Sequence, residues 1–187
     1  KYSEMINTGK APLPHKIIIE ATLRCNLSCV FCFRDTTKFK ELTTEELKKI
    51  IDNLGPTVKR VGLTGGEIFL RPDIFEIFDY ILEKKLSLGI LSNATLLNEE
   101  KIERLVKYKE INIGISLDGL EETHNKIRGH NAFGKTLKAI KGINKRIRIG
   151  VNTVITNKNI DDILPLFKLI SPYIHSYSLE FEMFNNK

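Results

Sequence analysis

Short apolar runs rich in β-branched residues alternate along this chain with segments whose apolar residues recur every three or four positions. The first pattern is typical of buried strands and the second of amphipathic helices. Thr43 and Asn98, each followed by glutamates, and the pair Pro72–Asp73 indicate where helices begin. The pattern predicts strands over 16–22, 60–64, 87–91, 110–117, 147–155 and 175–183, and helices over 43–54, 72–81, 98–106, 133–145 and 159–170.

The predicted order is a series of strand-then-helix steps, the last without its helix, repeating about every 30 residues. Such steps imply a parallel sheet covered by helices. We expect an α/β fold, a partial (β/α)6 barrel with parallel strands inside and helices outside; a flat doubly wound sheet is the alternative. Either architecture places a functional site at the carboxyl ends of the strands.

Domain organisation is expected to be simple. Residues 1–14, with Pro12 and Pro14, are predicted to be an extended N-terminal lead-in, and residues 15–187 one partial-barrel domain. Because the chain opens with Lys1, we expect it to be a piece of a longer protein.

Composition is ordinary for a globular protein: 42% of the 187 residues are hydrophobic and 28% are charged. No apolar run approaches the roughly 18 residues that a membrane span needs, and no signal-peptide pattern opens the chain. A cytoplasmic protein with no membrane partner is therefore expected. The net charge of +6 indicates a mild attraction to acidic partners.

The densest basic segment is 135–148, and its simplest interpretation is a solvated helix face. A docking surface for an acidic reductase, an acidic peptide or a nucleic acid is the alternative. Aromatic residues between the charges would favour nucleic acid, and this segment has none, so we do not expect a nucleic-acid partner.

All three cysteines of the chain, Cys25, Cys29 and Cys32, lie directly after the first predicted strand. Their odd number and the lack of distant cysteines argue against disulfides and favour a metal site in a reducing compartment. Three thiolates on one loop can hold three corners of a 4Fe–4S cluster and leave one iron open. A zinc site completed by a histidine and inert thiols are the alternatives, but no histidine is adjacent.

The run Cys25-x3-Cys29-x2-Cys32, with Phe31 before the last cysteine, resembles the signature of the radical S-adenosylmethionine (radical SAM) superfamily. Further segments, from about residue 17 to residue 159, resemble the family in order and spacing. They are Thr64-Gly65-Gly66-Glu67, Ser92-Asn93, the pattern Ser116-Leu117-Asp118-Gly119-x4-His124-x3-Arg128-Gly129, and the stretch 152–156 followed by Asn159. One departure is Ile68, where the family often has proline after Gly-Gly-Glu.

The resemblance implies a partial barrel of six strand–helix units and two cofactors, a 4Fe–4S cluster and S-adenosylmethionine. It implies that the open iron chelates the methionyl amino and carboxylate groups. It further implies that one electron from the cluster yields a 5′-deoxyadenosyl radical that abstracts a substrate hydrogen. The cluster's own electron would come from a low-potential donor of the flavodoxin or ferredoxin type. The cofactors thus supply the difficult chemistry, and the protein supplies position and shielding.

The same resemblance suggests a role for individual residues. The carbonyls of Gly65 and Gly66 and the carboxylate of Glu67 are expected to bind the methionyl ammonium, and Arg128 and Ser116 the methionyl carboxylate. Ser92 and Asn93 are candidates for the ribose hydroxyls. Phe31 is expected near the adenine, with core packing as its alternative, and Asn152 is a candidate contact to cofactor or substrate. Glu20, Glu180 and Glu182 face either the barrel interior or an exposed strand edge, the exposed edge being the preferred interpretation for the last strand.

The pattern after the fourth strand looks most like the branch of peptide and protein maturases and cofactor-biosynthesis enzymes, which usually continue into C-terminal auxiliary-cluster domains. Modification of a peptide or protein is therefore the first functional hypothesis. Cofactor biosynthesis on a small molecule is the second. The third is a non-catalytic iron–sulfur or zinc-binding module, which would not need the Gly-Gly-Glu segment, Ser116 or Arg128.

Overall fold

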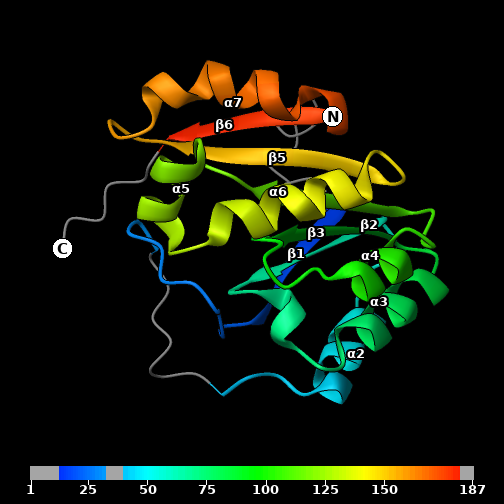
Figure 1. The fold of residues 1–187 in the computed structure, drawn as a ribbon. Helices are drawn as coiled ribbons and strands as arrows, with labels where there is room; N and C mark the ends of the chain where they lie inside the picture. Colours follow the sequence, from blue (N-terminus) through cyan, green and yellow to red (C-terminus); the bar gives the residue numbers. More distant parts are fainter. Residues whose placement is uncertain (1–12, 33–39, 182–187) are drawn as a thin grey trace, which may run out of the picture.

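The computed structural model describes residues 13–32 and 40–181 (Figure 1). Its centre is a single six-stranded sheet in which the strands follow one another in chain order and every neighbouring pair is parallel. The predicted strands are confirmed near their expected bounds; predicted strand positions 182–183 and most of the predicted lead-in lie outside the described residues. The strands are β1 (Lys16–Thr22), β2 (Arg60–Gly65), β3 (Ser87–Ser92), β4 (Ile111–Ser116), β5 (Arg148–Ile155) and β6 (Ser176–Phe181).

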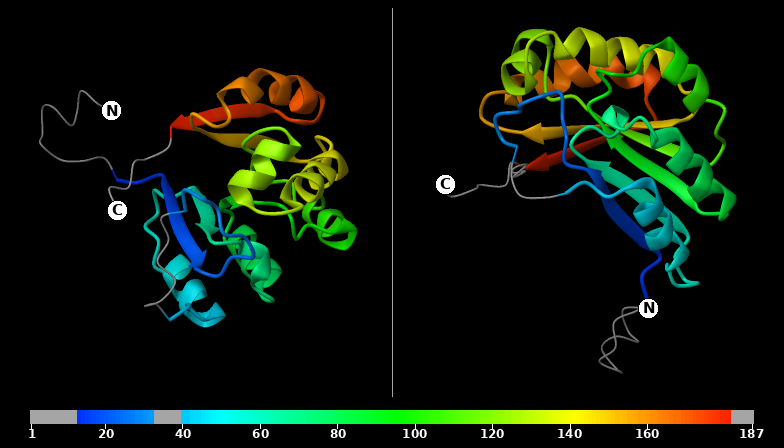
Figure 2. Two further views of the ribbon diagram at one scale, coloured as in Figure 1. Left: turned by 60° about the vertical axis from the view of Figure 1, so that its left-hand side comes forward. Right: turned by 90° about the horizontal axis from the view of Figure 1, so that it is seen from below.

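Helices cover the outer face of this curved sheet, which gives the α/β partial barrel expected from the sequence (Figure 2). The parallel strands need crossovers, and helices supply them. The α-helices are α2 (Thr44–Asp52), α3 (Ile74–Glu83), α4 (Glu99–Leu105), α5 (Glu121–Arg128), α6 (Ala132–Ile143) and α7 (Ile163–Ile170), and short 3-10 turns span Ile68–Leu70, Ile160–Asp162 and Ser171–Tyr173.

The hydrophobic core lies between the helices and the outer face of the sheet. Along β4, Ile111, Ile113 and Ile115 are buried toward the helices, and the alternate residues face the concave side. Because side chains alternate between the two faces of a strand, these three isoleucines of β4 all lie on the face toward the helices. The concave side carries glycines and polar side chains together with a few apolar ones, such as Ile18 and Leu91, and cavities open on it.

The predicted helix starts are confirmed. The Thr43 hydroxyl accepts a hydrogen bond from the Glu46 backbone N–H, while the Glu46 carboxylate accepts one from the Thr43 backbone N–H, forming a capping box. The Asn98 side chain caps α4 by accepting from the Lys101 backbone N–H. Asp73 precedes α3 as expected, but its side chain makes no cap bond to that helix.

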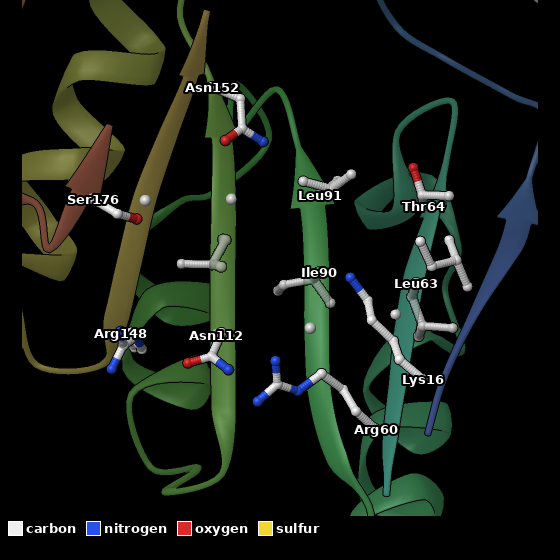
Figure 3. Close-up of a pocket in the computed structure, with 16 residues that line it drawn as sticks. Lys16, Arg60, Leu63, Thr64, Ile90, Leu91, Asn112, Arg148, Asn152 and Ser176 are labelled. Carbon is white, nitrogen blue, oxygen red and sulfur yellow. The ribbon is translucent and has the colours of Figure 1, made fainter. Parts of the chain in front are cut away.

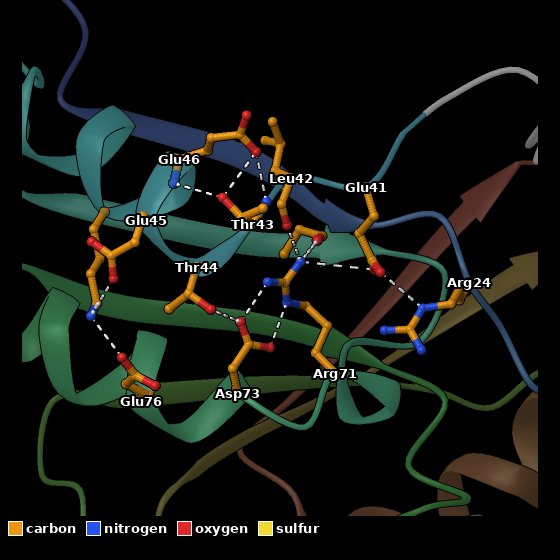
Figure 4. A network of polar contacts seen from close by, with 12 residues as sticks. Arg24, Glu41, Leu42, Thr43, Thr44, Glu45, Glu46, Arg71, Asp73 and Glu76 are labelled. Carbon is orange, nitrogen blue, oxygen red and sulfur yellow. Dashed lines mark hydrogen bonds and ion pairs between the residues drawn. The ribbon is translucent and has the colours of Figure 1, made fainter.

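Asp73 instead belongs to a network centred on Arg71, which is 5% exposed (Figure 4). The guanidinium donates to both carboxylate oxygens of Asp73 and to the backbone carbonyls of Ala21 and Leu42, at 2.6–3.0 Å. Thr44 donates to the same Asp73 carboxylate. This network therefore joins the exit of β1 to the starts of α2 and α3, next to the loop that carries the cysteines.

Helix α5 was not predicted from the sequence, which placed a loop between β4 and the helix starting near residue 133. Of its residues only Ile127 is a strongly apolar side chain, so the segment shows no amphipathic stripe. Its N-cap residue, Leu120, provides no side-chain hydrogen bond either. The helix is held by the burial of polar side chains, His124 and Arg128, which a hydrophobic pattern does not reveal.

Candidate active site

The cysteine loop follows β1 and is fixed at several points by backbone hydrogen bonds. Val30 donates its N–H to the Ile127 carbonyl of α5, and Cys32 donates to the Cys29 carbonyl, each at 3.0 Å. The second bond makes a tight turn that brings the last two cysteines together. The loop is thus supported by a helix from the opposite half of the sheet.

A pocket of about 250 Å³ opens at the carboxyl ends of the strands, where the fold rule places a site. It collects the predicted site residues with one exception, Glu67. Its lining comprises Glu20, Cys25, Cys29, Phe31, Cys32, Thr64, Gly65, Gly66, Leu91, Ser92, Asn93, Ser116, Arg128, Asn152, Val154 and Glu180.

The three thiols share this pocket and are each partly buried. Burial raises the pKa of the Cys29 thiol, and the nearby Arg128 guanidinium acts in the opposite direction by favouring the thiolate. Among the described residues, no three His, Cys, Asp or Glu side chains are close enough to hold a single metal ion. The three partly buried thiols on one loop supply the cysteine thiolates that a 4Fe–4S cluster takes as ligands.

The Gly65–Gly66 turn lies against the exit of β1. Gly65 has φ +134°, and a Cβ atom there would come within 2.0 Å of the Thr22 carbonyl oxygen. Gly66 donates its N–H to that same carbonyl at 2.8 Å. Only glycine fits at position 65, and the turn is thereby held beside the cysteine loop with its backbone facing the pocket.

Glu67 differs from its expected role as a direct cofactor contact. Its side chain is fully buried beneath the pocket, where one carboxylate oxygen accepts from the Ser92 hydroxyl at 2.8 Å and from the Phe69 N–H at 3.2 Å. The other oxygen accepts from the Asn93 N–H at 2.7 Å. Burial raises the pKa of this carboxyl, and the hydrogen bonds act against the rise. In this structure Glu67 therefore holds the β2 and β3 exits together.

Ser92 and Asn93 lie at the end of β3, as predicted, and both are almost completely buried. The Asn93 amide nitrogen donates to the Asn26 side-chain oxygen at 3.1 Å and lies 3.9 Å from the Cys25 sulfur. Its amide oxygen accepts from the Thr95 N–H and hydroxyl. Asn93 thus contacts the cysteine loop itself, a neighbour that its expected role at a ribose did not include.

Asp118 and Arg128 form a buried ion pair on the other side of the pocket. Arg128 donates its Nε–H to one Asp118 oxygen, and the second oxygen accepts from the Val154 N–H at 2.9 Å. The Arg128 guanidinium lies over the Phe31 ring at 5.4 Å and borders the pocket. Burial opposes its charge, but the Asp118 carboxylate, acting with the nearby Cys29 and Cys25, raises the pKa of Arg128.

His124 and Asn159 complete this second cluster. The Asp118 N–H donates to Nδ1 of His124 at 3.0 Å, and the Asn159 amide donates to the Asp118 carbonyl at 2.7 Å. His124 is fully buried, and burial lowers its pKa to about 4. Both residues stand in the sequence pattern shared with the family, but they act here by holding the β4 exit and not by reaching the pocket.

Ser116 and Asn152 are paired in register on β4 and β5 and both border the pocket, as expected. Phe31 borders it too, beneath Arg128. Glu20 and Glu180, on the two edge strands, line the same pocket although both residues are exposed. Glu180 therefore fits both interpretations of the last strand, because it borders the pocket and is also exposed at the sheet edge. Glu182 lies outside the described residues.

Known proteins resemble this chain in sequence and in fold. The profile described as "Radical SAM superfamily" matches residues 19–170. "Fe-coproporphyrin III synthase" of Methanosarcina barkeri is 35% identical over 160 residues, which cover 82% of this chain and 40% of that protein. "Antilisterial bacteriocin subtilosin biosynthesis protein AlbA" of Bacillus subtilis is 37% identical over 140 residues, covering 72% of this chain and 31% of that protein.

The fold is similar to a crystal structure of Streptococcus suis SuiB bound to its precursor peptide SuiA. The TM-score is 0.84 at 22% identity, and the match covers 97% of this chain and 42% of that one. The chain spans less than half the length of each of these relatives. Among the described residues, no helix combines the length and the apolar character that crossing a bilayer requires.

Proposed function

We propose that this chain, which belongs to the radical SAM superfamily, is the core of an enzyme that starts radical chemistry on a peptide or protein substrate. Members of the superfamily use a 4Fe–4S cluster and S-adenosylmethionine. The observation that carries the proposal is the convergence of three cysteines, the Gly65–Gly66 turn and Arg128 on one pocket. A purely structural metal loop would need neither the turn nor the buried guanidinium.

In this proposal Cys25, Cys29 and Cys32 hold the cluster, and the pocket beside them holds S-adenosylmethionine. When bound, the cluster would supply one electron for cleavage of the cofactor's sulfur–carbon bond, which would give methionine and the 5′-deoxyadenosyl radical used by the family to remove a substrate hydrogen. The electron comes from a low-potential donor of the flavodoxin or ferredoxin type. We assign this role to a domain that spans residues 15–187.

The chain's own groups position the cofactor. The backbone carbonyls of Gly65 and Gly66 accept hydrogen bonds from the methionyl ammonium. The Arg128 nitrogens that are not bonded to Asp118 donate to the methionyl carboxylate, as does the Ser116 hydroxyl. In this proposal Ser92 and Asn93 are the candidates for the ribose hydroxyls, Asn152 for a contact to cofactor or substrate, and Phe31 for the neighbour of the adenine. Glu67 and Asp118 act one step away, by holding the backbone and the guanidinium in place.

A peptide or protein substrate is favoured by two relatives: one is named for bacteriocin biosynthesis, and the other was crystallised with its precursor peptide. A small-molecule substrate in cofactor biosynthesis is the second candidate, because a relative at 35% identity is named a coproporphyrin synthase. A reaction in which added peptide leaves the yield of 5′-deoxyadenosine unchanged, while a tetrapyrrole raises it, would favour the second candidate.

The test of the cofactor assignment uses full-length protein reconstituted without oxygen. We expect close to four irons per chain and an electron paramagnetic resonance spectrum of the reduced protein that shifts when S-adenosylmethionine is added. The Cys29→Ala variant is expected to lose the cluster and the cleavage of the cofactor. Ser28→Ala, an exposed change in the same loop, is the matched control and should keep both. Bound zinc, or a spectrum indifferent to S-adenosylmethionine, would contradict the proposal.

A second variant tests the pocket separately from the cluster. Arg128→Lys keeps the positive charge beside Asp118 but loses the planar fork that suits a carboxylate. We expect normal iron content and an affinity for S-adenosylmethionine about tenfold lower, the cost of one charge-assisted hydrogen bond. An unchanged affinity would remove Arg128 from the cofactor site.

A further inference from the structure

A second cavity, of about 260 Å³, occupies the concave face of the sheet on the amino-terminal side of the pocket with the cysteines (Figure 3). Thr64, Leu91 and Asn152 line both cavities, so the two adjoin. Nothing in the proposed cofactor chemistry uses this space. The region therefore needs its own explanation.

Basic side chains gather at the far end of this cavity. Lys16 and Arg60 extend from β1 and β2 across the cavity, and Asn112 and Arg148 stand opposite on β4 and β5 (Figure 3). The segment 135–148, predicted to present one basic face, is thereby divided. Lys135, Lys138 and Lys141 line an outer groove beside α4, whereas Arg148 lies on the concave face of the sheet.

These cations are not neutralised by the described part of the chain. No described carboxylate forms an ion pair with Lys16, Arg60 or Arg148, and the cavity lining contains no Asp or Glu. The contact found for Arg60 is a 3.3 Å hydrogen bond from Nε to the Ser87 hydroxyl. Like charges gathered in a concave space raise the local concentration of anions.

Strand register places the basic and polar groups in two pairs. Lys16 is the register partner of Arg60, and Asn112 is the partner of Arg148. Neighbouring strands lie about 4.8 Å apart, so each pair can converge on the oxygens of one anionic group. An arginine fork beside an ammonium or an amide is well suited to carboxylate and phosphate oxygens.

The floor between the two pairs leaves room for a ligand. Gly62 and Gly89 are register partners on β2 and β3, and a Cβ atom at Gly89 would have nothing nearer than the Val61 carbonyl oxygen at 4.0 Å. Ile18 and Leu91, which are 60% and 43% exposed, form apolar walls. The cavity thus combines an apolar middle with a cationic end.

We propose that this cationic end is a subsite for carboxylate or phosphate oxygens at the end of the substrate remote from its reacting carbon. This inference rests on the proposed function, because it places the reacting carbon near the cysteines. The two cavities together are polarised: Glu20 and Glu180 border the cysteine end, and Lys16, Arg60 and Arg148 border the other. An elongated substrate is therefore oriented with its anionic end toward the amino ends of the strands.

The test measures binding of two probes, citrate and inorganic phosphate, to full-length protein by calorimetry at low ionic strength. Single variants Arg60→Gln and Arg148→Gln are each expected to weaken binding of the preferred probe about tenfold, as for loss of one charge-assisted contact. Lys49→Gln, an exposed lysine of α2 outside the cavity, removes the same charge and serves as the matched control, with no change expected.

The outcomes separate the sources of the anion. Tighter binding of citrate assigns the subsite to carboxylates, and tighter binding of phosphate assigns it to phosphoryl groups. Absence of binding, or equal loss in Lys49→Gln, would overturn the subsite.

Iron content and the shift of the spectrum with S-adenosylmethionine are recorded on the same samples. We expect both to be unchanged in Arg60→Gln and Arg148→Gln, because neither residue borders the cysteine pocket. If unsubstituted protein binds no cluster but binds citrate through Arg60 and Arg148, the proposed function fails and the anion subsite survives. The reverse result rejects the subsite alone.

Discussion

The candidate active site has two halves, one at the ends of β2 and β3 and one at the ends of β4 and β5. Each half contains a buried carboxylate, and the two carboxylates are held by different kinds of partner. Glu67 follows β2 and joins it to β3 by accepting from three neutral donors, two backbone N–H groups and the Ser92 hydroxyl. Asp118 follows β4 and joins it to β5 through the Val154 N–H, but it also balances the buried charge of Arg128. Both carboxylate side chains are fully buried.

This difference indicates in which half the stability of the fold depends on an ionised carboxylate. Burial raises the pKa of Glu67 because no cation is bonded to it, so its ionised form is tolerated and not required. Removing the charge of Asp118 would instead leave a guanidinium buried without a counter-ion, which costs far more than a lost neutral hydrogen bond. The β4–β5 half should therefore be the more fragile one.

The largest effect is expected for Asp118→Asn. The change keeps the size of the side chain but leaves Arg128 uncompensated, so the free energy of unfolding should fall by about 3–5 kcal/mol. Urea unfolding followed by circular dichroism measures it. The double variant Asp118→Asn with Arg128→Met removes both charges and should recover part of the loss. A single-variant cost below about 1 kcal/mol, the range of exposed ion pairs, would show that this pair is not effectively buried.

The second effect is a pH dependence that belongs to the same half. The pKa of His124 is about 4 when folded and near 6.5 when unfolded, so the unfolded chain binds more protons between these values. Stability contributed by neutral His124 is complete above pH 6.5 and is lost as the pH falls toward 4, by about 3 kcal/mol in total.

His124→Asn tests this pH dependence directly, because an amide oxygen can replace Nδ1 as the acceptor for the Asp118 N–H without titrating. Unfolding free energies at several pH values between 4 and 7 should show a shallower slope for this variant than for the unsubstituted protein. The exposed His130→Asn is the matched control and should leave the slope unchanged. Equal slopes in all three proteins would show that His124 is protonated without cost.

The third effect lies in the other half and should be smaller. Glu67→Gln removes a charge that burial already disfavours, and it sacrifices one acceptor, the oxygen that receives the Asn93 N–H. We expect a loss of about 1 kcal/mol near neutral pH, to be measured alongside Asp118→Asn. Because the folded pKa of Glu67 is raised, its ionisation lowers the stability of the unsubstituted protein as the pH rises above the ordinary value. The loss caused by Glu67→Gln should therefore grow at acidic pH; a loss as large as that of Asp118→Asn would remove the contrast between the halves.

The sequence predicted the strands of both halves, because β-branched runs that alternate with amphipathic segments report burial directly. It also predicted the cysteine loop from residue type and, through the resemblance to a known family, most of the residues that line the pocket; Leu91 and Val154 were not among them. The direction of the Glu67 side chain was not predictable, because its partners Ser92 and Asn93 lie on another strand. Helix α5 was missed because the contacts that stabilise it, through His124 and Arg128, form only in the folded protein. The assignment of single residues to parts of the cofactor stays a prediction.

The smallest effect concerns a side-chain hydrogen bond between the two halves, which are also joined by the pairing of β3 with β4. The buried Thr136 hydroxyl of α6 donates to the Asn93 carbonyl at 2.8 Å, so a helix of the crossover between β4 and β5 holds the exit of β3. Thr136→Val has nearly the same shape but leaves that carbonyl without its donor, and should cost about 1 kcal/mol of unfolding free energy. Thr136→Ser retains the hydroxyl and should recover the bond while losing a methyl group. If the valine variant is as stable as the unsubstituted protein, this hydrogen bond does not help to align the halves. In that case their polar clusters act independently, and the losses measured for Glu67→Gln and Asp118→Asn should be additive.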